Sequence, residues 1–459
     1  MKILLVLPAA EHLRVTRKSR RVTKRNMLRF SLLSLTTVAA LTPSGHQVEI
    51  VDENVEAVDF DADIDLVGIT FMTALANRAY EIAAEFQARG RIVVGGGYHP
   101  TLCPEDAAEH LDAVVVGDAE GTWPRLLADV EAGQLRKIYR SEQLCDLADT
   151  PVPRRDLTDR TAKHYVTTNA VQTGRGCPND CRYCSIAAFH HSTHRNRPLA
   201  RVMEELRQVP RDFMFVDDNI IGDRDYARRL FRAMAPMRKR WVSQCSIDIA
   251  DDPETLDLAR RAGCRGLFIG IETVSQRNLE AMNKSFNDSG RYRERIAAIR
   301  RKGIGIVAGM IVGLDDDDAG VFQRTLRFLQ RTCIDSLQLN IMTPLPGTPL
   351  YDDMERQGRI IDRDWSHYDF RRCVFRPARM TPGQLQDGAD WLYSQFYRLD
   401  RIVWRFARGL FRIGLLPAVL ALKLNLTYRR DLIAQGRRGR NPAREGIPLP
   451  VGLERPAEG

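Results

Sequence analysis

The sequence predicts an α/β protein with a doubly wound parallel sheet at the N-terminus, a partial barrel of six strand–helix units after it, and a helical C-terminal extension. Short apolar strands alternate with helical stretches in two successive regions, which is typical of parallel sheets covered by helices. A polar stretch broken by prolines, residues 141–165, separates these regions. We therefore expect domains at residues 1–140 and 166–365, a linker at 141–165, and an extension over residues 366–459.

The composition fits a globular chain of two or three domains. Of the 459 residues, 44% are apolar and 28% are charged, and the formal net charge is +9, which makes the chain moderately basic. The nine cysteines are an odd number and only three of them cluster. This pattern argues against a disulfide framework and for a reducing, cytoplasmic compartment. No stretch reaches the roughly 18 uninterrupted apolar residues of a membrane span.

The first region contains five strand candidates separated by helical patterns such as residues 77–90. The candidates are residues 3–7, 47–52, 65–70, 92–94 and 113–116. The basic run 17–25 and the apolar stretch 27–41 together look like a targeting signal. Because one strand candidate precedes this segment and another follows it, we interpret 27–41 as an amphipathic helix of the first domain.

The loops after the third, fourth and fifth strands indicate a ligand site, because ligands of open α/β sheets bind at the carboxyl ends of the strands. Three consecutive glycines at 95–97 would let the backbone approach a large ligand closely. No G-x-G-x-x-G opens the first helix, so a dinucleotide is less expected. We interpret His99 as capping local backbone rather than as a ligand. The candidate binding residues are Thr70, Met72, Gly96, Gly97, Tyr98 and Gly117.

The second region contains six strand candidates, at residues 166–173, 213–216, 242–247, 266–271, 304–312 and 336–341, with helical stretches such as 224–234, 253–262 and 318–331. Six units fit a partial, open barrel better than a closed barrel of eight, and parallel barrels carry their chemistry at the C-terminal strand ends. For Asp248 and Asp315, capping of the next helix is an equal alternative to a role in the site. The polar residues at these strand ends are Asp217, Asp218, Asn219, Ser246, Asp248, Glu272 and Asp315.

Three cysteines follow the first strand of this region with the spacing C-x3-C-x2-C, at Cys177, Cys181 and Cys184. They can bring three thiolates onto one metal centre without an obvious fourth, which leaves a position open for chemistry. The alternative is a zinc ion whose fourth ligand is one of three nearby histidines, and the spacing alone does not decide between zinc and an iron–sulfur cluster. These histidines are His190, His191 and His194.

The cysteine motif, with the aromatic Tyr183 before its last cysteine, resembles the signature of radical S-adenosylmethionine (SAM) enzymes. Gly-Arg-Gly-Cys-Pro, Phe-Val-Asp-Asp-Asn, Gly-Ile-Glu-Thr and Gly-Met-Ile-Val-Gly-Leu follow in the order expected of that superfamily. In the first region, Gly-Gly-x-x-His-Pro and Val-Val-Gly-x-x-Glu-x-x-Trp-Pro resemble the Rossmann-like cobalamin-binding domain of class B type radical SAM methyltransferases. The chain lacks the Asp-x-His-x-x-Gly of other cobalamin proteins, which leaves the ligand beneath the cobalt unassigned.

The resemblance implies roles for the candidate residues. The three cysteines would ligate a 4Fe–4S cluster whose open iron takes the amino and carboxylate groups of SAM. Asp217, Asp218 and Asn219 stand where the family's Gly-Gly-Glu segment contacts the methionyl amine, although the residues differ here. The six candidate residues of the first domain would contact cobalamin. The other implied cofactor contacts are Tyr183, Ser246, Glu272 and the segment from Gly309 to Leu314.

The function implied by the resemblance is cobalamin-dependent radical SAM methylation of an unactivated carbon. In the family's mechanism, an electron from a donor such as flavodoxin or ferredoxin leads to a 5'-deoxyadenosyl radical, and methylcobalamin supplies the methyl group. The alternative is a non-methylating enzyme of the same superfamily that forms a ring or oxidises its substrate. Only Cys103 and Cys145 precede the core, too few for typical methylthiolation. A non-catalytic sensory module is less expected, because the cysteine triad is intact.

The C-terminal region suits contact with a lipid surface. A helix is expected from Thr381 or Pro382 through Asp400. The arginine- and aromatic-rich segment 402–412 and the apolar segment 413–422 favour interfacial binding, with packing on the core as the alternative. The basic runs 14–29 and 398–440 fit a solvated face or an acidic phospholipid surface, and the tail from Gln435 is expected to be disordered. We expect a lipid-like substrate such as a polycyclic terpenoid, peripheral contact with the inner face of the membrane, and no nucleic-acid partner.

Overall fold

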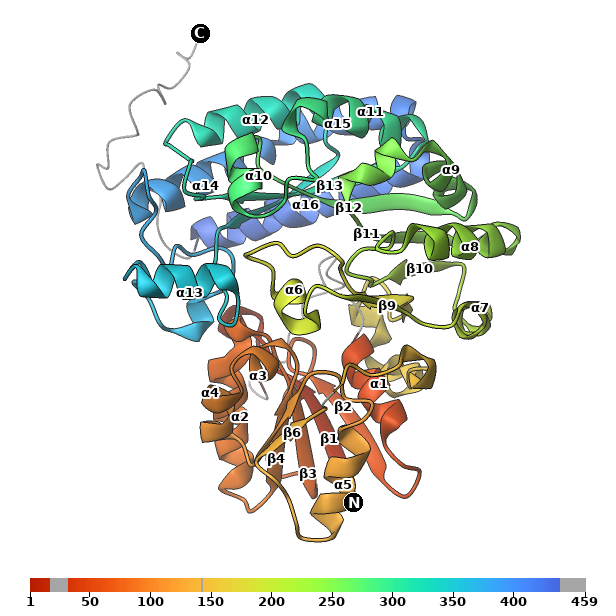
Figure 1. Cartoon of the computed structure of the whole chain (residues 1–459), viewed down its shortest axis with the longest axis vertical. Helices are drawn as coiled ribbons and strands as arrows, with labels where there is room; N and C mark the ends of the chain where they lie inside the picture. The colour runs from red at the N-terminus through yellow and green to blue at the C-terminus, as the bar shows by residue number, and fades with distance from the viewer. Residues whose placement is uncertain (17–31, 142, 438–459) are drawn as a thin grey trace. The chain divides into compact units, whose positions relative to one another are not determined.

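The computed structural model describes residues 1–16, 32–141 and 143–437 (Figure 1). It divides into two compact units. Unit 1 comprises Met1–Met234, Pro344–Asp353 and Arg363–Asp369, and unit 2 comprises Ala235–Thr343, Met354–Asp362 and Phe370–Gly459. The basic run at 17–25 and residues 438–459 of the tail lie outside the described residues. The tail was expected to be disordered from Gln435, but residues 435–437 still belong to a helix that starts at Leu415.

The first sheet of unit 1 has six parallel strands in the order β2-β1-β3-β4-β5-β6. The chain winds outward in one direction from β1 to β2 and in the other from β3 to β6, so the predicted doubly wound topology is present. The sixth strand was not predicted from the sequence. The strands are β1 Lys2–Leu7, β2 Gln47–Asp52, β3 Leu66–Thr70, β4 Ile92–Gly96, β5 Ala113–Val116 and β6 Ile138–Arg140.

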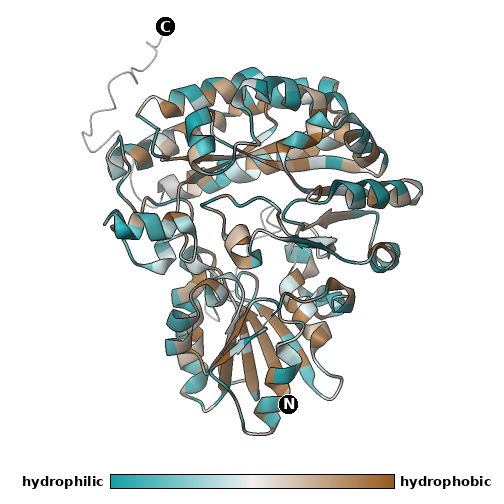
Figure 2. Cartoon of the chain, in the orientation of Figure 1, coloured by the Kyte–Doolittle hydropathy of each residue, from teal (hydrophilic) through white to brown (hydrophobic). Residues whose placement is uncertain are grey.

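Helices cover both faces of this sheet (Figure 1). Alternate residues of β1 enter different cores: Leu4 packs toward α2 and α4, whereas Leu5 packs toward α1 and α5. Figure 2 shows the strands as strongly apolar, as expected of a sheet buried on both faces. The helices are α1 Leu33–Leu41, α2 Ala76–Gln87, α4 Pro104–His110 and α5 Trp123–Glu131. The helix predicted at 27–41 begins at Leu33 in the described part of the chain.

The polar segment predicted as a linker has local structure of its own. It contains the 3₁₀ helices Leu147–Asp149 and Arg155–His164. Just beyond them, the buried Tyr165 hydroxyl donates to Asp52 Oδ2 at 2.6 Å, and Arg160 donates to the backbone oxygen of Ile50 at 2.6 Å. The sequence did not predict these short helices, because the segment is held by side-chain hydrogen bonds to β2 and has no apolar stripe.

The remainder of unit 1 holds two parallel strands, β7 Ala170–Val171 and β10 Asp212–Phe215, with helices α7 Leu199–Gln208 and α8 Arg224–Met234. The strand predicted at 166–173 is therefore much shorter than expected. Its end is diverted because Asp217 Oδ1 accepts the backbone N–H groups of Thr173 and Gly174, at 3.0 and 2.7 Å. The chain continues into an antiparallel hairpin of β8 Gly174–Gly176 and β9 His194–Asn196.

Unit 2 contains a parallel sheet in the order β14-β13-β12-β11. Its strands correspond to the last four strands predicted for the barrel. They are β11 Arg240–Cys245, β12 Cys264–Glu272, β13 Gly305–Val312 and β14 Ser336–Ile341, with helices α9 Pro253–Arg261, α10 Gln276–Ala281, α11 Tyr292–Arg301 and α12 Val321–Thr332. The register of β12 on β13 shifts between Gly270 and Glu272, a bulge at the C-terminal end of the strand.

Three helices complete unit 2: α14 Pro382–Phe396, α15 Leu399–Arg412 and α16 Leu415–Arg437. Thr381 begins α14 with a capping box, as predicted, but the helix ends at Phe396 instead of continuing through Asp400. It ends there because Tyr397 is fully buried and its hydroxyl donates to the backbone oxygen of Leu337 at 2.5 Å. Within the described ranges, no helix combines the length and apolar character needed to cross a membrane.

Candidate functional site

The three clustered cysteines lie in unit 1 on the loop between β8 and the short helix α6 Ser185–His190. None of the three forms a disulfide in the described part of the chain; Cys181 is buried, whereas Cys177 and Cys184 are partly exposed. The Cys184 N–H donates to the backbone oxygen of Cys181 at 3.0 Å, and Asn179 Nδ2 donates to Cys177 Sγ at 3.4 Å. One short, internally bonded loop therefore presents three unoxidised thiols, a donor set that fits an iron–sulfur cluster with one open iron.

The contacts of two of the three neighbouring histidines disfavour them as a fourth zinc ligand. Both ring nitrogens of His194 are engaged, Nδ1 with the Gly176 backbone oxygen at 2.9 Å and Nε2 with Asn196 Oδ1 at 3.0 Å. His190 Nδ1 lies 3.2 Å from Arg195 Nη2, and burial lowers the pKa of His190 to about 4. In the described part of the chain, the three cysteine sulfurs do not gather within 4.8 Å of one another. Thiolates on a single zinc, with bonds of roughly 2.3 Å, would have to do so.

Asp217 follows β10 and uses only one of its carboxylate oxygens. Oδ1 accepts from Thr173 N, Thr173 Oγ1 and Gly174 N, at 3.0, 2.5 and 2.7 Å. Oδ2 is buried and has no hydrogen-bond partner among the described residues. Burial raises the pKa of Asp217 to about 7. A buried oxygen left without a donor is costly, so this oxygen is suited to receive one from a bound ligand such as an ammonium group.

The next two residues each accept a hydrogen bond from nearby backbone. Asp218 Oδ2 accepts the Gly176 N–H at 2.8 Å, next to the first cysteine, and burial raises the pKa of Asp218. The backbone oxygen of Asn219 accepts the Gly222 N–H at 2.9 Å. Asp217 differs in that its Oδ2 is a buried acceptor with no partner among the residues that the structure describes.

Two glycines in the loops of the first sheet have positive φ angles. Gly97 has a φ of +105°, and a Cβ added there would lie 2.9 Å from Thr70 Oγ1 and 3.0 Å from the Phe71 backbone oxygen. Gly117 has a φ of +86° with open space around the position of a Cβ, and its N–H donates to Thr101 Oγ1 at 3.0 Å. Met72 is 52% exposed. These loops leave main chain and an apolar side chain accessible at the strand ends, which fits a large, flat ligand.

Within unit 1, Tyr98 links these loops to the cysteine loop. It begins the short helix α3 Tyr98–Leu102, and its ring packs on Phe189 of α6 with the centroids 5.0 Å apart. Burial, followed by the charges of Asp218 and Cys184, raises the pKa of Tyr98 well above its ordinary value. The loop after β4 and the cysteine segment are therefore neighbours within unit 1.

His99 does not cap backbone, so that expectation was wrong. The ring is fully buried in a network of side chains, with Nε2 at 3.0 Å from Asp106 Oδ2 and 3.1 Å from the Tyr80 hydroxyl. Nδ1 lies 3.3 Å from Thr73 Oγ1. Because both nitrogens are engaged, His99 is a structural residue.

Unit 2 carries the remaining candidate residues. Glu272, at the bulge of β12, has a φ of +63°, and its Oε1 lies 2.6 Å from Lys284 Nζ in a largely buried pair. A non-glycine residue in this conformation is strained, a feature that clusters at functional sites. Gly309 makes room for a ring, since an added Cβ would lie 2.8 Å from Phe268 Cζ. The Leu314 N–H donates to the buried Asp317 at 3.1 Å.

Ser246 begins the 3₁₀ helix Ile247–Asp251, and Tyr183 is half-buried before Cys184. For Asp248 and Asp315, the structure does not show the helix capping that was the alternative to a role in the site. Asp252, rather than Asp248, caps α9 through the Thr255 N–H at 3.0 Å. Asp315 pairs with Arg359 at 2.6 Å instead of capping a helix. Lys284 and Asp317 were not predicted from the sequence, because neither stands in a recognised motif.

Two family models match the chain. The Radical SAM superfamily model matches residues 171–329, and the B12 binding domain model matches residues 31–127. The cysteine loop, Asp217 and Glu272 lie within the first match, and the glycine-rich loops lie within the second.

Curated relatives cover most of the chain. The sequence is 30% identical over 384 residues to bacteriochlorophyllide d C-12(1)-methyltransferase of Chlorobaculum tepidum, covering 81% of this chain and 82% of the relative. It is 29% identical to the hopanoid C-2 methylase of Rhodopseudomonas palustris, covering 73% of this chain and 67% of that protein.

Solved structures share the fold. The radical SAM methyltransferase TsrM from Kitasatospora setae, solved with cobalamin and a [4Fe-4S] cluster, aligns with a TM-score of 0.67 and 16% identity over 95% of this chain and 99% of that one. The cobalamin-dependent radical SAM enzyme OxsB aligns with a TM-score of 0.66 and 15% identity, over 94% and 71% of the two chains. The likeness confirms the predicted fold class: a doubly wound domain, a partial barrel and a helical extension.

Proposed function

Because the chain belongs to the cobalamin-binding radical SAM superfamily, we propose that it methylates an unactivated carbon of a hydrophobic, lipid-like substrate. It is a radical SAM enzyme of the methyltransferase type, and its cofactors are a 4Fe–4S cluster, SAM and cobalamin. When bound, these groups supply radical formation and a methyl donor. The observation that carries the proposal is the packing of Tyr98 on Phe189, which brings the glycine-rich loops to the cysteine loop.

The roles of individual residues are part of the proposal. Cys177, Cys181 and Cys184 would hold the cluster, and Asp217 would accept the amino group of SAM through its unused buried oxygen. The proposed cobalamin contacts are Thr70, Met72, Gly96, Gly97, Tyr98 and Gly117. The proposed further SAM contacts are Tyr183, Asp218, Asn219, Ser246, Glu272, Gly309 and Leu314. The domain limits 1–140, 141–165, 166–365 and 366–459 stay predictions.

The substrate class is supported by the relatives, which are named for bacteriochlorophyllide d and hopanoids. The predicted polycyclic, lipid-like substrate is consistent with both names. A second candidate is ring formation without methylation, because the chain is also 25% identical over 406 residues to the anaerobic magnesium-protoporphyrin IX monomethyl ester cyclase of Cereibacter sphaeroides. That match covers 79% of this chain and 66% of the cyclase.

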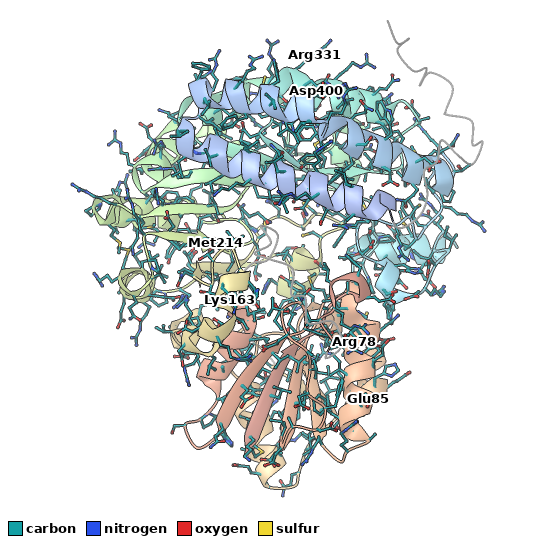
Figure 3. The ribbon with its side chains drawn as sticks, turned by 180° about the vertical axis from the view of Figure 1, so that it is seen from behind. Arg78, Glu85, Lys163, Met214, Arg331 and Asp400 are labelled. Atoms are coloured by element: carbon teal, nitrogen blue, oxygen red, sulfur yellow. The ribbon has the colours of Figure 1, made fainter. Side chains whose placement is uncertain are left out.

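An enzyme of this class needs an electron donor and a small-molecule substrate. We propose flavodoxin or ferredoxin as the donor, with no nucleic-acid partner. Peripheral contact with the inner face of the membrane is supported by α15, which exposes Val403, Trp404 and Phe411. Arg408 lies 4.7 Å over the Trp404 ring. Asp400, labelled in Figure 3, is the one carboxylate in this helix.

The opposite face of α15 is packed within unit 2. Ile402 and Gly409 are buried there, and the Arg405 guanidinium lies 3.9 Å from the centre of the Phe396 ring. One face of α15 therefore packs on unit 2, and we propose that the other face binds the membrane surface. A cytoplasmic location stays a prediction, based on the free cysteines.

Anaerobic reconstitution tests the radical chemistry. The protein is loaded with iron, sulfide, SAM, cobalamin and reductant, and 5'-deoxyadenosine is quantified. We expect time-dependent formation by the native chain and loss in Cys184→Ala. Cys333→Ser is the matched control, because this partly exposed thiol ends α12 and is not in the cysteine loop. Deoxyadenosine formation that survives in Cys184→Ala, or its absence from the native chain, would contradict the proposal.

A further inference from the structure

The hairpin β8–β9 brackets the whole cysteine loop. The chain leaves β8 at Gly176, passes the three cysteines and α6, and returns at His194, which is the cross-strand partner of Gly176. Arg175 and Arg195 are also direct cross-strand partners. Opposed residues of an antiparallel pair project from the same face, and like charges in that arrangement repel. The hairpin therefore requires negative charge between its two arginines.

Two carboxylates on the loop after β5 supply that charge. Asp118 Oδ1 lies 2.9 Å from Arg175 Nη1, and Asp118 Oδ2 lies 2.9 Å from Arg195 Nη2. Glu120 accepts two hydrogen bonds from Arg175, with Oε1 at 2.6 Å from Nη2 and Oε2 at 3.0 Å from Nη1. The side chains are only 5% exposed for both acids, 13% for Arg175 and 18% for Arg195. Burial protects these pairs from screening by salt.

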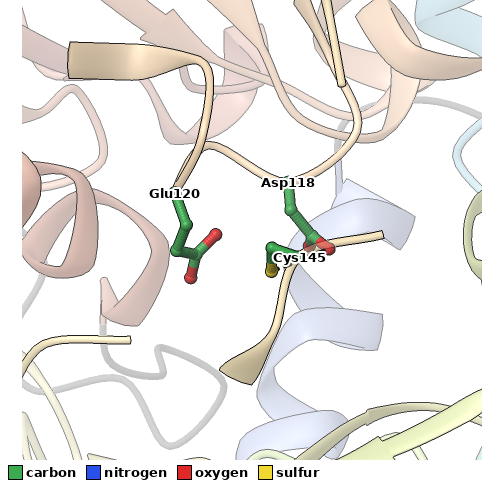
Figure 4. A group of neighbouring side chains, drawn as sticks. All are labelled: Asp118, Glu120 and Cys145. Carbon is green, nitrogen blue, oxygen red and sulfur yellow. Dashed lines mark hydrogen bonds between the residues drawn. The ribbon is translucent and has the colours of Figure 1, made fainter. Parts of the chain in front are cut away.

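These groups satisfy one another rather than forming a metal site. Asp118, Glu120 and Cys145 place ligand atoms within 4.8 Å of one another (Figure 4). Both carboxylates are already used by guanidinium groups, and burial raises the pKa of the Cys145 thiol to about 12. Arg175 and Arg195 hold the pKa of Asp118 below its ordinary value although burial opposes them. A cation would have to displace two bound arginines.

We propose that Asp118, Glu120, Arg175 and Arg195 are positioning residues that fix both ends of the cysteine loop against the loop following β5. This inference rests on the proposed function and deepens it, because Gly117 of the same loop is a proposed cobalamin contact. A planar guanidinium held at two nitrogens fixes orientation as well as distance. The apolar contact of Tyr98 with Phe189 is not directional in this way.

The consequence is coupling between two chemical events. The cysteine loop would carry SAM cleavage, whereas the glycine-rich loops would carry the methyl donor. The fraction of cleaved SAM that leads to methylated product then depends on the distance and angle between the two loops. The ion-pair network would set both through the positions of the two loops.

Hydrogen exchange in the cofactor-free full-length chain tests the positioning directly. In Glu120→Gln, amides of β8, β9 and the cysteine loop should exchange at least about tenfold faster, whereas amides of β1 and β3 keep their native rates. Asp63→Asn is the matched control, because its ion pair with Lys2 is exposed, with the carboxylate 78% accessible. Unchanged exchange in 174–196, or equally faster exchange throughout unit 1, would overturn the proposal.

The reconstituted enzyme provides the second readout, which is the methylated product formed per 5'-deoxyadenosine. In Glu120→Gln this ratio should fall by about 10- to 100-fold while deoxyadenosine formation changes little. The exchanged pair Glu120→Arg with Arg175→Glu should recover part of the ratio. A purely structural role would lower both products together and leave the ratio unchanged. If the native chain forms no deoxyadenosine, the proposed function fails, and the exchange experiment still decides the positioning.

Discussion

Replacing Asp217 separates its structural role from its proposed role toward SAM. Asp217 Oδ1 accepts hydrogen bonds from Thr173 N, Thr173 Oγ1 and Gly174 N, while Oδ2 is buried and has no partner within residues 1–16, 32–141 and 143–437. Asp217→Ala removes both oxygens. Asp217→Asn keeps one oxygen for the three existing donors and replaces the other by an amide, which cannot accept a hydrogen bond from an ammonium group.

The magnitudes follow from these contacts. In Asp217→Ala, two backbone N–H groups and one hydroxyl lose a buried acceptor, at about 1–3 kcal/mol each, so we expect a loss of at least about 3 kcal/mol in the free energy of unfolding. Asp217→Asn should stay within about 1 kcal/mol of the native chain at pH 6. Loss of a hydrogen bond to a charged group costs about 1.5–3 kcal/mol, so SAM should bind about 10- to 100-fold more weakly to both variants.

Urea unfolding at pH 6 measures the first effect, and equilibrium dialysis of SAM against cluster-loaded protein measures the second. The asparagine variant is decisive because its fold should be intact. Native SAM affinity in Asp217→Asn would refute the assignment of Oδ2 to the amino group. Native stability in Asp217→Ala would refute the role of Oδ1 in holding the chain between β7 and β8.

Three further predictions concern pH, the glycine-rich loop and the exposed helix. Burial raises the pKa of Asp217 from 3.8 to about 7. Between these pH values the native state therefore holds a proton that the unfolded state has lost. The stability of the cofactor-free protein should consequently fall as pH rises through this range. Asp217→Asn should reduce this slope by up to about 1.4 kcal/mol per pH unit, measured by urea unfolding across the range; an unchanged slope would contradict it. Gly97→Ala forces a Cβ to within 2.9 Å of Thr70 Oγ1 at a φ of +105° and should weaken cobalamin binding in absorbance titrations. Gly90→Ala, with a φ of +72° and open surroundings, is the strain control, and equal effects of the two would count against the assignment. Replacing Trp404 and Phe411 by serine should lower co-sedimentation with anionic vesicles by about tenfold or more. The control variant Leu13→Ser, also at an exposed apolar position, should sediment like the native chain. Equal sedimentation of the two variants would exclude α15 as the membrane contact.

Local patterns predicted much of the fold. The bounds of β2, β5, β14 and α8 agree with the sequence prediction because each is an apolar or amphipathic run ended by polar residues. Strand β6 was missed, since it has three residues and only Tyr139 is buried. The hairpin β8–β9 was also missed, because Gly-Arg-Gly and His-Arg-Asn carry no apolar alternation. Long-range polar contacts create this hairpin.

The candidate site, too, was only partly predictable from the sequence. The cysteine spacing is local and therefore readable from the sequence. The pairing of Glu120 with Arg175 spans 55 residues, and no periodicity connects the two positions. Each nevertheless stands in a motif that the sequence analysis singled out, Val-Val-Gly-x-x-Glu and Gly-Arg-Gly-Cys. The motifs marked both residues as notable, while the contact between them required the fold.

Transfer of a labelled methyl group tests the central claim most directly. The reconstituted protein is incubated anaerobically with methyl-labelled SAM, reductant, and an extract of polycyclic lipids, with and without cobalamin. We predict labelled lipid product that requires cobalamin and is absent from Cys184→Ala. Deoxyadenosine formation with an unlabelled product carrying a new ring or oxidised carbon would contradict methylation and favour the cyclase-like alternative.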